Sequence, residues 1–200
     1  MELFTAIEQR RAIKHYDHNA PMSPNDFERM MNAILLSPTS YNIQHWRFIR
    51  VTDSNTRLKI KEAAWGQQQV EDAAELIILC ADSQAWSDQP QRYWANADAT
   101  TQSILLPMIA SFYDGKPQLQ RDEAMRSCGM AAQTLMLSAK ALGYDTCPMI
   151  GFDDEAVADI IQLPKGHVIS MMITIGKAAK AANVRGGQLP LSKVLRENTF

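Results

Sequence analysis

Short apolar runs alternate along this chain with longer segments in which apolar residues recur at helical spacing. Glu75–Ala81, which reads ELIILCA, and His167–Ile175 are continuous apolar runs, as expected for strands buried on both faces. Trp46–Thr52 is a further strand candidate, and another strand leads into Tyr144–Phe152. The pattern therefore predicts four or five strands with helices between them.

Helices are predicted where capping residues precede apolar positions at helical spacing. Ser23 fits an N-cap with Pro24 at the first helical position, and Asp153 fits the cap of a later helix. Asp114–Pro117 breaks the chain clearly, whereas Ser83–Gln102 gives no readable pattern. The predicted helices cover residues 1–9, 23–36, 53–65, 121–142 and 153–161.

The helix predicted over Arg121–Leu142 is apolar almost all the way round after Ser127. A helix of that kind is buried on every side, and a chain of 200 residues can hardly surround it alone. We therefore expect a second subunit to cover part of it. Ala178–Phe200 has too few large apolar residues for a core of its own. We predict one domain over 1–177 and an arm over 178–200 that packs on the partner subunit.

Composition and charge narrow the class of protein. A hydrophobic share of 46% over 200 residues is typical of one globular domain. The formal charge of -2 gives little support for nucleic-acid binding, and no apolar run reaches the roughly 18 residues of a membrane span. The N-terminus lacks the order of a signal peptide, so we expect a cytoplasmic protein.

The cysteines Cys80, Cys128 and Cys147 fall in different segments without C-x-x-C spacing. This spacing indicates neither a disulfide framework nor a metal site, and we expect three buried small side chains. The chain also lacks the G-x-S-x-G of many hydrolases and the G-x-G-x-x-G of dinucleotide-binding domains.

A polar segment, Ser37–Phe48, follows the second predicted helix and reads SPTSYNIQHWRF. It offers hydroxyl and amide groups at close spacing, on Thr39, Ser40, Asn42 and Gln44. Together with its aromatic residues, such a loop could hold a planar heterocycle. Its composition is equally that of an ordinary helix end, a turn and the start of a strand.

SPTSYNIQHWRF resembles the loop of the FMN-dependent nitroreductase family, in which S-P-S/T-S, an Asn and Q-x-W follow a helix. RRAIKHYD resembles the opening motif of that family, and YDTCPMIGF resembles its strand-end motif G-x-x-x-x-P-x-x-G-F. The resemblance covers nearly the whole chain and is strongest to small bacterial NAD(P)H nitroreductases. It implies an α+β fold, with a mixed sheet flanked by helices, in an intertwined homodimer with FMN at the interface.

The resemblance also implies which residues bind FMN. Arg10, Arg11 and Lys14 match the cations that grip the ribityl phosphate and the pyrimidine edge, although a solvated basic turn is the alternative. Ala12 stands where the family commonly has Ser, and the missing hydroxyl contact is a loss of about 1 kcal/mol. In the family the polar loop lies over the flavin of the partner subunit. Its implied contacts are Pro38, Thr39, Ser40, Asn42 and Gln44.

The remaining implied contacts lie on the second half of the chain and on one short polar run. Backbone N–H groups of Ile150 and Gly151 would point at flavin N5 and O4, where a Cβ on Gly151 would obstruct the ring. Gln67 and Gln69 are candidates for the ring edge, with a surface turn as the alternative. The family's usual tail Lys and Arg are replaced here by Gly186 and Gln188. The further candidates are Pro148, Met149, Lys177 and Arg185.

The implied activity is reduction of nitroaromatics, quinones or similar small acceptors by ping-pong two-electron transfer from NAD(P)H. We assign no catalytic side chain, because the cofactor carries the chemistry and solvent can supply the protons. Two other classes stay open. One is a flavin-binding storage or sensing protein without turnover, and the other is a helical dimerisation module, which leaves the cations and the polar loop unexplained.

Overall fold

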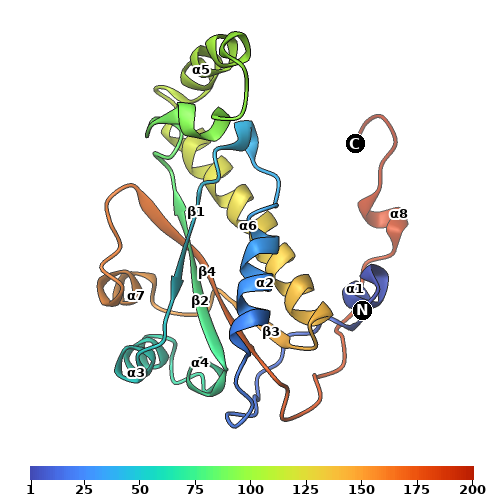
Figure 1. Ribbon diagram of the computed structural model, residues 1–200. Helices are drawn as coiled ribbons and strands as arrows, with labels where there is room; N and C mark the ends of the chain where they lie inside the picture. Colours follow the sequence, from blue (N-terminus) through green and yellow to red (C-terminus); the bar gives the residue numbers. More distant parts are fainter.

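An antiparallel sheet separates two layers of helices in the computed structural model, which describes residues 1–200 (Figure 1). The strands lie in the order β1-β2-β4-β3 and all three pairs are antiparallel. Their bounds are β1 (Trp46–Arg50), β2 (Glu75–Asp82), β3 (Asp145–Met149) and β4 (His167–Gly176). The predicted α+β class is confirmed. The sheet is antiparallel rather than mixed, because each connecting segment returns the chain in the direction opposite to that of the neighbouring strand. Outside the named strands, Ala12 and Thr146 form one isolated parallel bridge.

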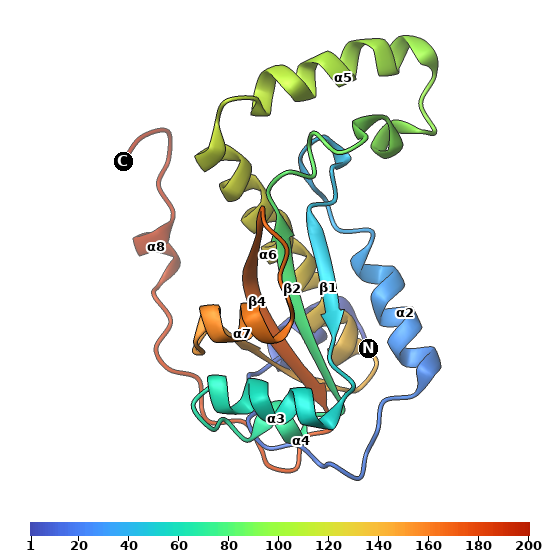
Figure 2. The ribbon, with the colours of Figure 1, turned by 90° about the vertical axis from the view of Figure 1, so that its left-hand side faces the viewer.

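Helices cover both faces of this sheet, with α2 and α6 on one face and α3, α4 and α7 on the other (Figures 1 and 2). The predicted N-caps Ser23 and Asp153 each accept a backbone hydrogen bond from the first turn, and Asp53 caps α3 in the same way. The helices are α1 (Leu3–Gln9), α2 (Pro24–Ile34), α3 (Ser54–Ala63), α4 (Gln69–Asp72), α5 (Ala99–Tyr113), α6 (Pro117–Ala141), α7 (Asp154–Ile160) and α8 (Leu191–Val194), with 3-10 turns η1 (Ser40–Asn42) and η2 (Pro90–Trp94).

Strand β2 is the centre of the core, because every one of its residues is buried. Its side chains alternate between the two layers: Ile77 and Leu79 pack in the cluster with α2 and α6, while Leu76 and Ile78 pack in the cluster with α3 and α7. Each such side chain contributes about 1.5–3 kcal/mol by leaving water. The expectation that the apolar run is buried on both faces is confirmed.

Helix α6 is not buried on every side within one chain. Ser127, Cys128, Ala131 and Leu135 face the core with 0% exposure, whereas Met130 is 37% exposed. One chain therefore leaves part of this helix uncovered, since the sheet and α2 cover only part of its circumference, and burial of the rest by a second subunit stays a prediction.

Helix α5 begins at the end of Ser83–Gln102 and continues through residues for which no element was predicted, and it crosses the end of the sheet above α6 (Figure 2). Only Ile109 and Tyr113 of its 15 residues are buried, and Pro107 lies inside the helix. A helix with such a narrow buried strip has little periodicity to detect.

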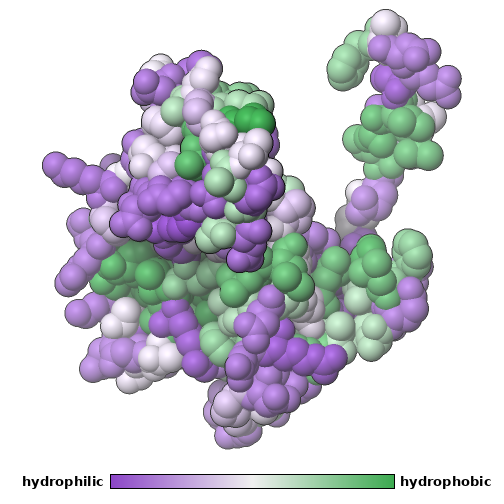
Figure 3. Space-filling model, turned by 45° about the horizontal axis from the view of Figure 1, so that its top comes forward, coloured by the Kyte–Doolittle hydropathy of each residue, from purple (hydrophilic) through white to green (hydrophobic).

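The C-terminal segment from Asn183 onward is exposed throughout and projects away from the sheet. Large apolar side chains are exposed on it, and Figure 3 shows them as green atoms on the projecting segment. They are Val184, Leu189, Leu191, Val194, Leu195 and Phe200. None of the helices of the chain combines the length and apolar character needed to cross a bilayer.

Candidate cofactor site

The polar loop before β1 has an unusual backbone. Tyr41, Asn42 and Gln44 have φ values of 50°, 57° and 54°, in the left-handed region that residues other than glycine seldom adopt. Such conformations cost on the order of 1–3 kcal/mol each unless the surroundings hold them. The Nδ2 of Asn42 donates to the Tyr93 carbonyl at 2.7 Å, and the Trp94 indole donates to the Tyr41 carbonyl at 3.0 Å.

The first part of the loop is also tied to α6. The Ser37 hydroxyl donates to Thr134 Oγ1 at 2.8 Å, and Thr39 Oγ1 lies 2.9 Å from Ser127 Oγ. Ser40 is half-buried, whereas Pro38 is exposed. The predicted loop residues therefore lie together on a fixed backbone at the β1 edge of the sheet.

A second group of predicted residues meets at the end of β3. Gln67 Nε2 donates to the Gly151 carbonyl at 2.7 Å, and Gln69 Nε2 donates to Gln67 Oε1 at 2.9 Å. Gln69 Nε2 also lies 3.7 Å from Met149 Sδ. Ile150 is 78% exposed beside them. These five residues come from two separate segments of the chain, so the fold places the GQQQ run and the MIG run side by side.

Two cations lie beside the same strand. The Ile13 N–H donates to the Thr146 carbonyl at 3.0 Å and so aligns residues 12–14 along β3. Burial raises the pKa of the Cys147 thiol, and the nearby charges of Lys14 and Arg10 oppose this increase. Neither of these cations has an ion-pair partner or a side-chain hydrogen bond in the chain. Their charges are therefore available to an anionic ligand.

The tail approaches this group from the other side. Arg185 Nη2 donates to the carbonyls of Glu8 at 2.7 Å and Arg10 at 3.2 Å, and Arg11 donates to the Asn183 carbonyl. Arg185 therefore lies next to Arg10, with its Nη2 engaged by backbone carbonyls, and its role as a cation of the FMN site stays a prediction.

Three predicted residues lie at the margin of this group. Lys177 Nζ donates to the Gly143 carbonyl at 2.5 Å and lies 3.9 Å from the centre of the Tyr144 ring, so its ammonium is already engaged. Ala12 is exposed on its bridge to β3. Pro148 is a residue of β3 opposite Ile173.

The two groups lie at opposite edges of the sheet. The loop runs directly into β1, whereas Gly151 and the cations adjoin β3, and the strand order puts β2 and β4 between these edges. One chain therefore does not bring all the predicted residues to one place. It carries two half-sites, one formed by residues 38–44 and the other by the β3 group.

Trp65 belongs with the β3 group although the sequence analysis did not select it. Its side chain is 71% exposed, its φ is +56°, and a Cβ added to Gly151 would lie 3.3 Å from its ring. A bulky residue in that conformation is uncommon. The sequence signal that could have identified Trp65 as a site residue is its position directly before Gly66 and Gln67.

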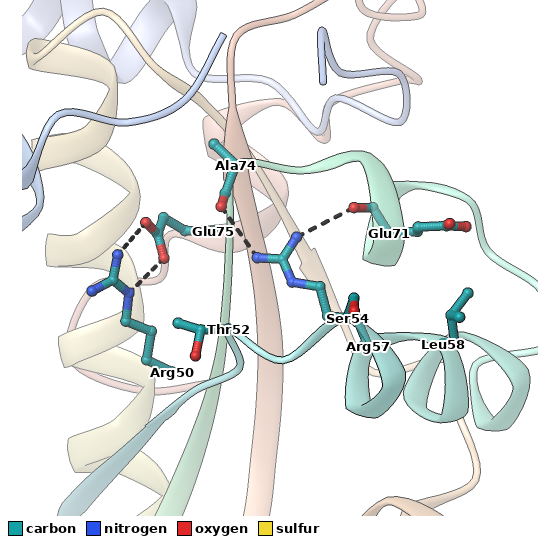
Figure 4. Close-up of a pocket in the computed structure, with 8 residues that line it drawn as sticks. All are labelled: Arg50, Thr52, Ser54, Arg57, Leu58, Glu71, Ala74 and Glu75. Carbon is teal, nitrogen blue, oxygen red and sulfur yellow. Dashed lines mark hydrogen bonds and ion pairs between the residues drawn. The ribbon is translucent and has the colours of Figure 1, made fainter. Parts of the chain in front are cut away.

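A cleft of about 380 Å³ elsewhere on the chain contains none of the predicted residues (Figure 4). Glu75 in it binds Arg50 through two hydrogen bonds of 2.8 and 2.6 Å. The Arg57 guanidinium is surrounded by backbone carbonyls, those of Val51, Glu71, Ala73 and Ala74. Because these charged groups are already satisfied within the chain, the cleft is structural.

The three cysteines are free and buried, which confirms the expectation of burial. Burial raises the pKa of the Cys80 thiol to about 11 and that of Cys128 to about 12, so both stay protonated and unreactive at neutral pH. No group of three or more potential metal ligands is present in the chain.

Comparison with known proteins identifies the fold. The sequence profile of the Nitroreductase family matches residues 7–177. Protein DrgA of Synechocystis is 46% identical over 200 residues, covering 98% of this chain and 95% of the relative. MhqN of Bacillus subtilis, whose name gives NAD(P)H nitroreductase as a provisional activity, is 32% identical over 94% of both chains.

A solved structure from Exiguobacterium sibiricum, provisionally named a nitroreductase and containing FMN, superposes with a TM-score of 0.90. It is 25% identical and the match covers 98% of this chain and 97% of the other. The resemblance carried by the three motifs is confirmed, and the chain belongs to the nitroreductase family.

Proposed function

We propose that this protein is an FMN-dependent NAD(P)H oxidoreductase that reduces nitroaromatics, quinones or similar acceptors. It works as an intertwined homodimer in the cytoplasm, where NAD(P)H is supplied. The observation that carries the proposal is the separation of the two half-sites at opposite edges of the sheet. A second copy of the chain can bring the loop of one subunit to the β3 group of the other.

The residues of the β3 half-site fit FMN. Arg10 and Lys14 carry charges without partners, which suits a phosphate and the polar edge of the ring. A Cβ on Gly151 would lie 3.3 Å from the Trp65 ring, which is tighter than an ordinary contact, and the neighbouring Ile150 is exposed, so the backbone there is accessible to a flat ligand. FMN, when bound, supplies the two-electron chemistry, and the chain positions it and keeps water away.

Homodimer formation is supported by surfaces that one chain leaves uncovered. Met130 on α6 is 37% exposed, and the apolar side chains of the tail have no surface to pack on. Exposed apolar area of this extent is typical of an interface. The tail would lie on the partner, as residues 178–200 are expected to do.

The names of relatives support the reaction class. MhqN and YodC of Bacillus subtilis are provisionally NAD(P)H nitroreductases, and a Thermus thermophilus relative is an NADH dehydrogenase. We propose a ping-pong order, in which NAD(P)H leaves before the acceptor enters the same place. The side chains of the two half-sites bind and orient FMN, and solvent supplies the protons for the reduction.

The purified protein is expected to be yellow, with about one FMN per subunit, and anaerobic NADPH or NADH should bleach it. A visible spectrum before and after the addition tests this. A yellow protein that neither nucleotide bleaches would instead support a storage or sensing role. Colourless protein that takes up no added FMN would refute the cofactor assignment.

Replacing Arg10 with Ala should weaken FMN binding about ten- to hundredfold, since a charge-assisted hydrogen bond to phosphate of roughly 1.5–3 kcal/mol is lost. Arg29→Ala is a matched control, because Arg29 is exposed on α2 and away from the half-site. Fluorescence titration with FMN measures both variants. An unchanged affinity of the Arg10 variant would remove this residue from the site.

A further inference from the structure

Three polar side chains form a closed triangle behind the polar loop. His45 Nδ1 lies 3.0 Å from Ser127 Oγ and 3.2 Å from Thr39 Oγ1, and the two hydroxyls are 2.9 Å apart. His45 and Ser127 are both 0% exposed. The triangle therefore joins the half-buried Thr39 of the loop to two fully buried side chains, one of them in the middle of α6.

The triangle holds both ends of the loop at one point. Thr39 precedes the left-handed residues Tyr41 and Asn42, and His45 directly follows the left-handed Gln44. Residues in such backbone conformations persist only where the surroundings fix them. The contacts to Ser127 supply that fixation, because they attach the loop to a rigid helix.

The imidazole has hydrogen-bond partners on one nitrogen only. His45 Nε2 is buried and has no partner in the chain. In the neutral imidazole with the proton on Nδ1, Nε2 carries no hydrogen and needs no acceptor. The protonated imidazole would carry a charged N–H at Nε2, buried and without an acceptor. Protonation of His45 therefore destabilises the conformation in which His45 contacts Thr39 and Ser127.

We propose that His45 is a positioning residue, which, as a neutral imidazole, holds residues 39–44 in the conformation that completes the FMN site of the partner subunit. This inference rests on the proposed function. It goes beyond that function because His45 is not one of the predicted FMN contacts, and its effect passes through its contacts with Thr39 and Ser127.

The ionisable groups around His45 come from four elements, β1, β2, β4 and α5. Asp82 at the end of β2 is paired with Arg47 of β1 at 2.8 Å and lies 3.7 Å from His167 Nε2. Tyr113 of α5 has its ring centre 6.1 Å from that of His45, and α6 presents only the neutral Ser127 hydroxyl.

These surroundings set the direction of the pH dependence. Burial lowers the pKa of His45 to about 4, while the Asp82 carboxylate opposes this decrease and the Arg47 charge adds to it. The pKa with the loop ordered is thus below the unperturbed value of about 6.5. The stabilisation is complete above about pH 6.5 and is lost as the pH falls towards 4.

Two substitutions of His45 test the proposal. His45→Leu removes both ring nitrogens, whereas His45→Asn keeps an amide near the position of Nδ1 and cannot become charged. At pH 7.5 we expect FMN affinity to fall about tenfold or more in the Leu variant and to stay within about threefold of wild type in the Asn variant, where a hydrogen bond is kept.

The pH profile separates positioning from a purely structural role. Between pH 7.5 and 5, wild type should lose about tenfold more FMN affinity than His45→Asn, since each unit of pKa difference is a factor of ten. The comparison cancels titration of the FMN phosphate. His167→Gln, at the other side of Asp82, should keep the wild-type profile. An Asn variant with the wild-type pH dependence would overturn the proposal.

Hydrogen exchange on the flavin-free protein makes the result independent of the proposed function. Amides of residues 39–44 should exchange faster in His45→Leu than in wild type, while those of β2 stay protected. If wild type takes up no FMN, the proposed function fails and this measurement still decides the role of His45. Unchanged protection of residues 39–44 in the Leu variant would refute positioning.

Discussion

Removing residues 178–200 is expected to abolish the dimer and FMN retention together. The tail carries six large exposed apolar side chains that have no surface in their own chain, and its Arg185 lies beside Arg10. Burying side chains of this size contributes about 1.5–3 kcal/mol each, so their loss removes a large part of the association energy. In the proposed dimer each FMN site combines half-sites from two subunits, so a monomer would keep only part of the contacts.

Light scattering and the ratio of flavin to protein absorbance measure the two effects on one sample. A matched control keeps the tail at full length but replaces Val184, Leu189 and Leu191 with Ser. It should also weaken the dimer, whereas Arg185→Ala should mainly weaken FMN binding. A truncated protein that is monomeric and retains stoichiometric flavin would contradict the coupling of assembly to cofactor binding.

Replacing Arg57 with Leu is expected to lower the free energy of unfolding by about 3–5 kcal/mol, because buried acceptors lose their donors. The guanidinium donates to the carbonyls of Val51, Glu71, Ala73 and Ala74, and so connects α3 to the start of β2. Figure 4 draws the bonds to Glu71 and Ala74. Burial lowers the pKa of Arg57 but leaves an arginine charged at neutral pH.

Thermal unfolding should show this as a decrease in Tm of about 10 °C, since roughly 2–4 °C corresponds to each kcal/mol in a chain of this size. Arg57→Lys keeps the charge with fewer donors, and its Tm should fall between those of Arg57→Leu and wild type. Lys59→Leu removes a cation from the exposed face of the same helix and should change stability by less than about 0.5 kcal/mol. Equal Tm values for the Arg57→Leu variant and the wild-type protein would show that water replaces the guanidinium.

Local sequence patterns predicted the strands that are buried on both faces and the helix caps that depend on neighbouring residues. Strands β2 and β4 appear within one residue of the predicted bounds, because continuous apolar runs signal burial on two sides. The caps at Ser23 and Asp153 act through a few neighbouring atoms and were equally readable. Helix α5 was missed because Ile109 and Tyr113 alone define its buried strip.

The candidate site was predictable as a set of residues but not as an arrangement. Motifs identified Gln67 and Gly151, yet their hydrogen bond depends on how α3 and β3 pack, which no local pattern encodes. The opposite placement of the loop depends on the strand order. Trp65 escaped detection because its exposure and left-handed backbone are properties of the folded chain.

The placement of the two half-sites at opposite edges has a genetic consequence. A chain with a defective Arg10 still carries an intact polar loop, and a chain with a defective loop still carries an intact β3 group. In a mixed dimer of the two, one composite site receives both lesions and the other receives none. Two inactive alleles of this protein should therefore complement each other, with one working flavin centre in each mixed dimer.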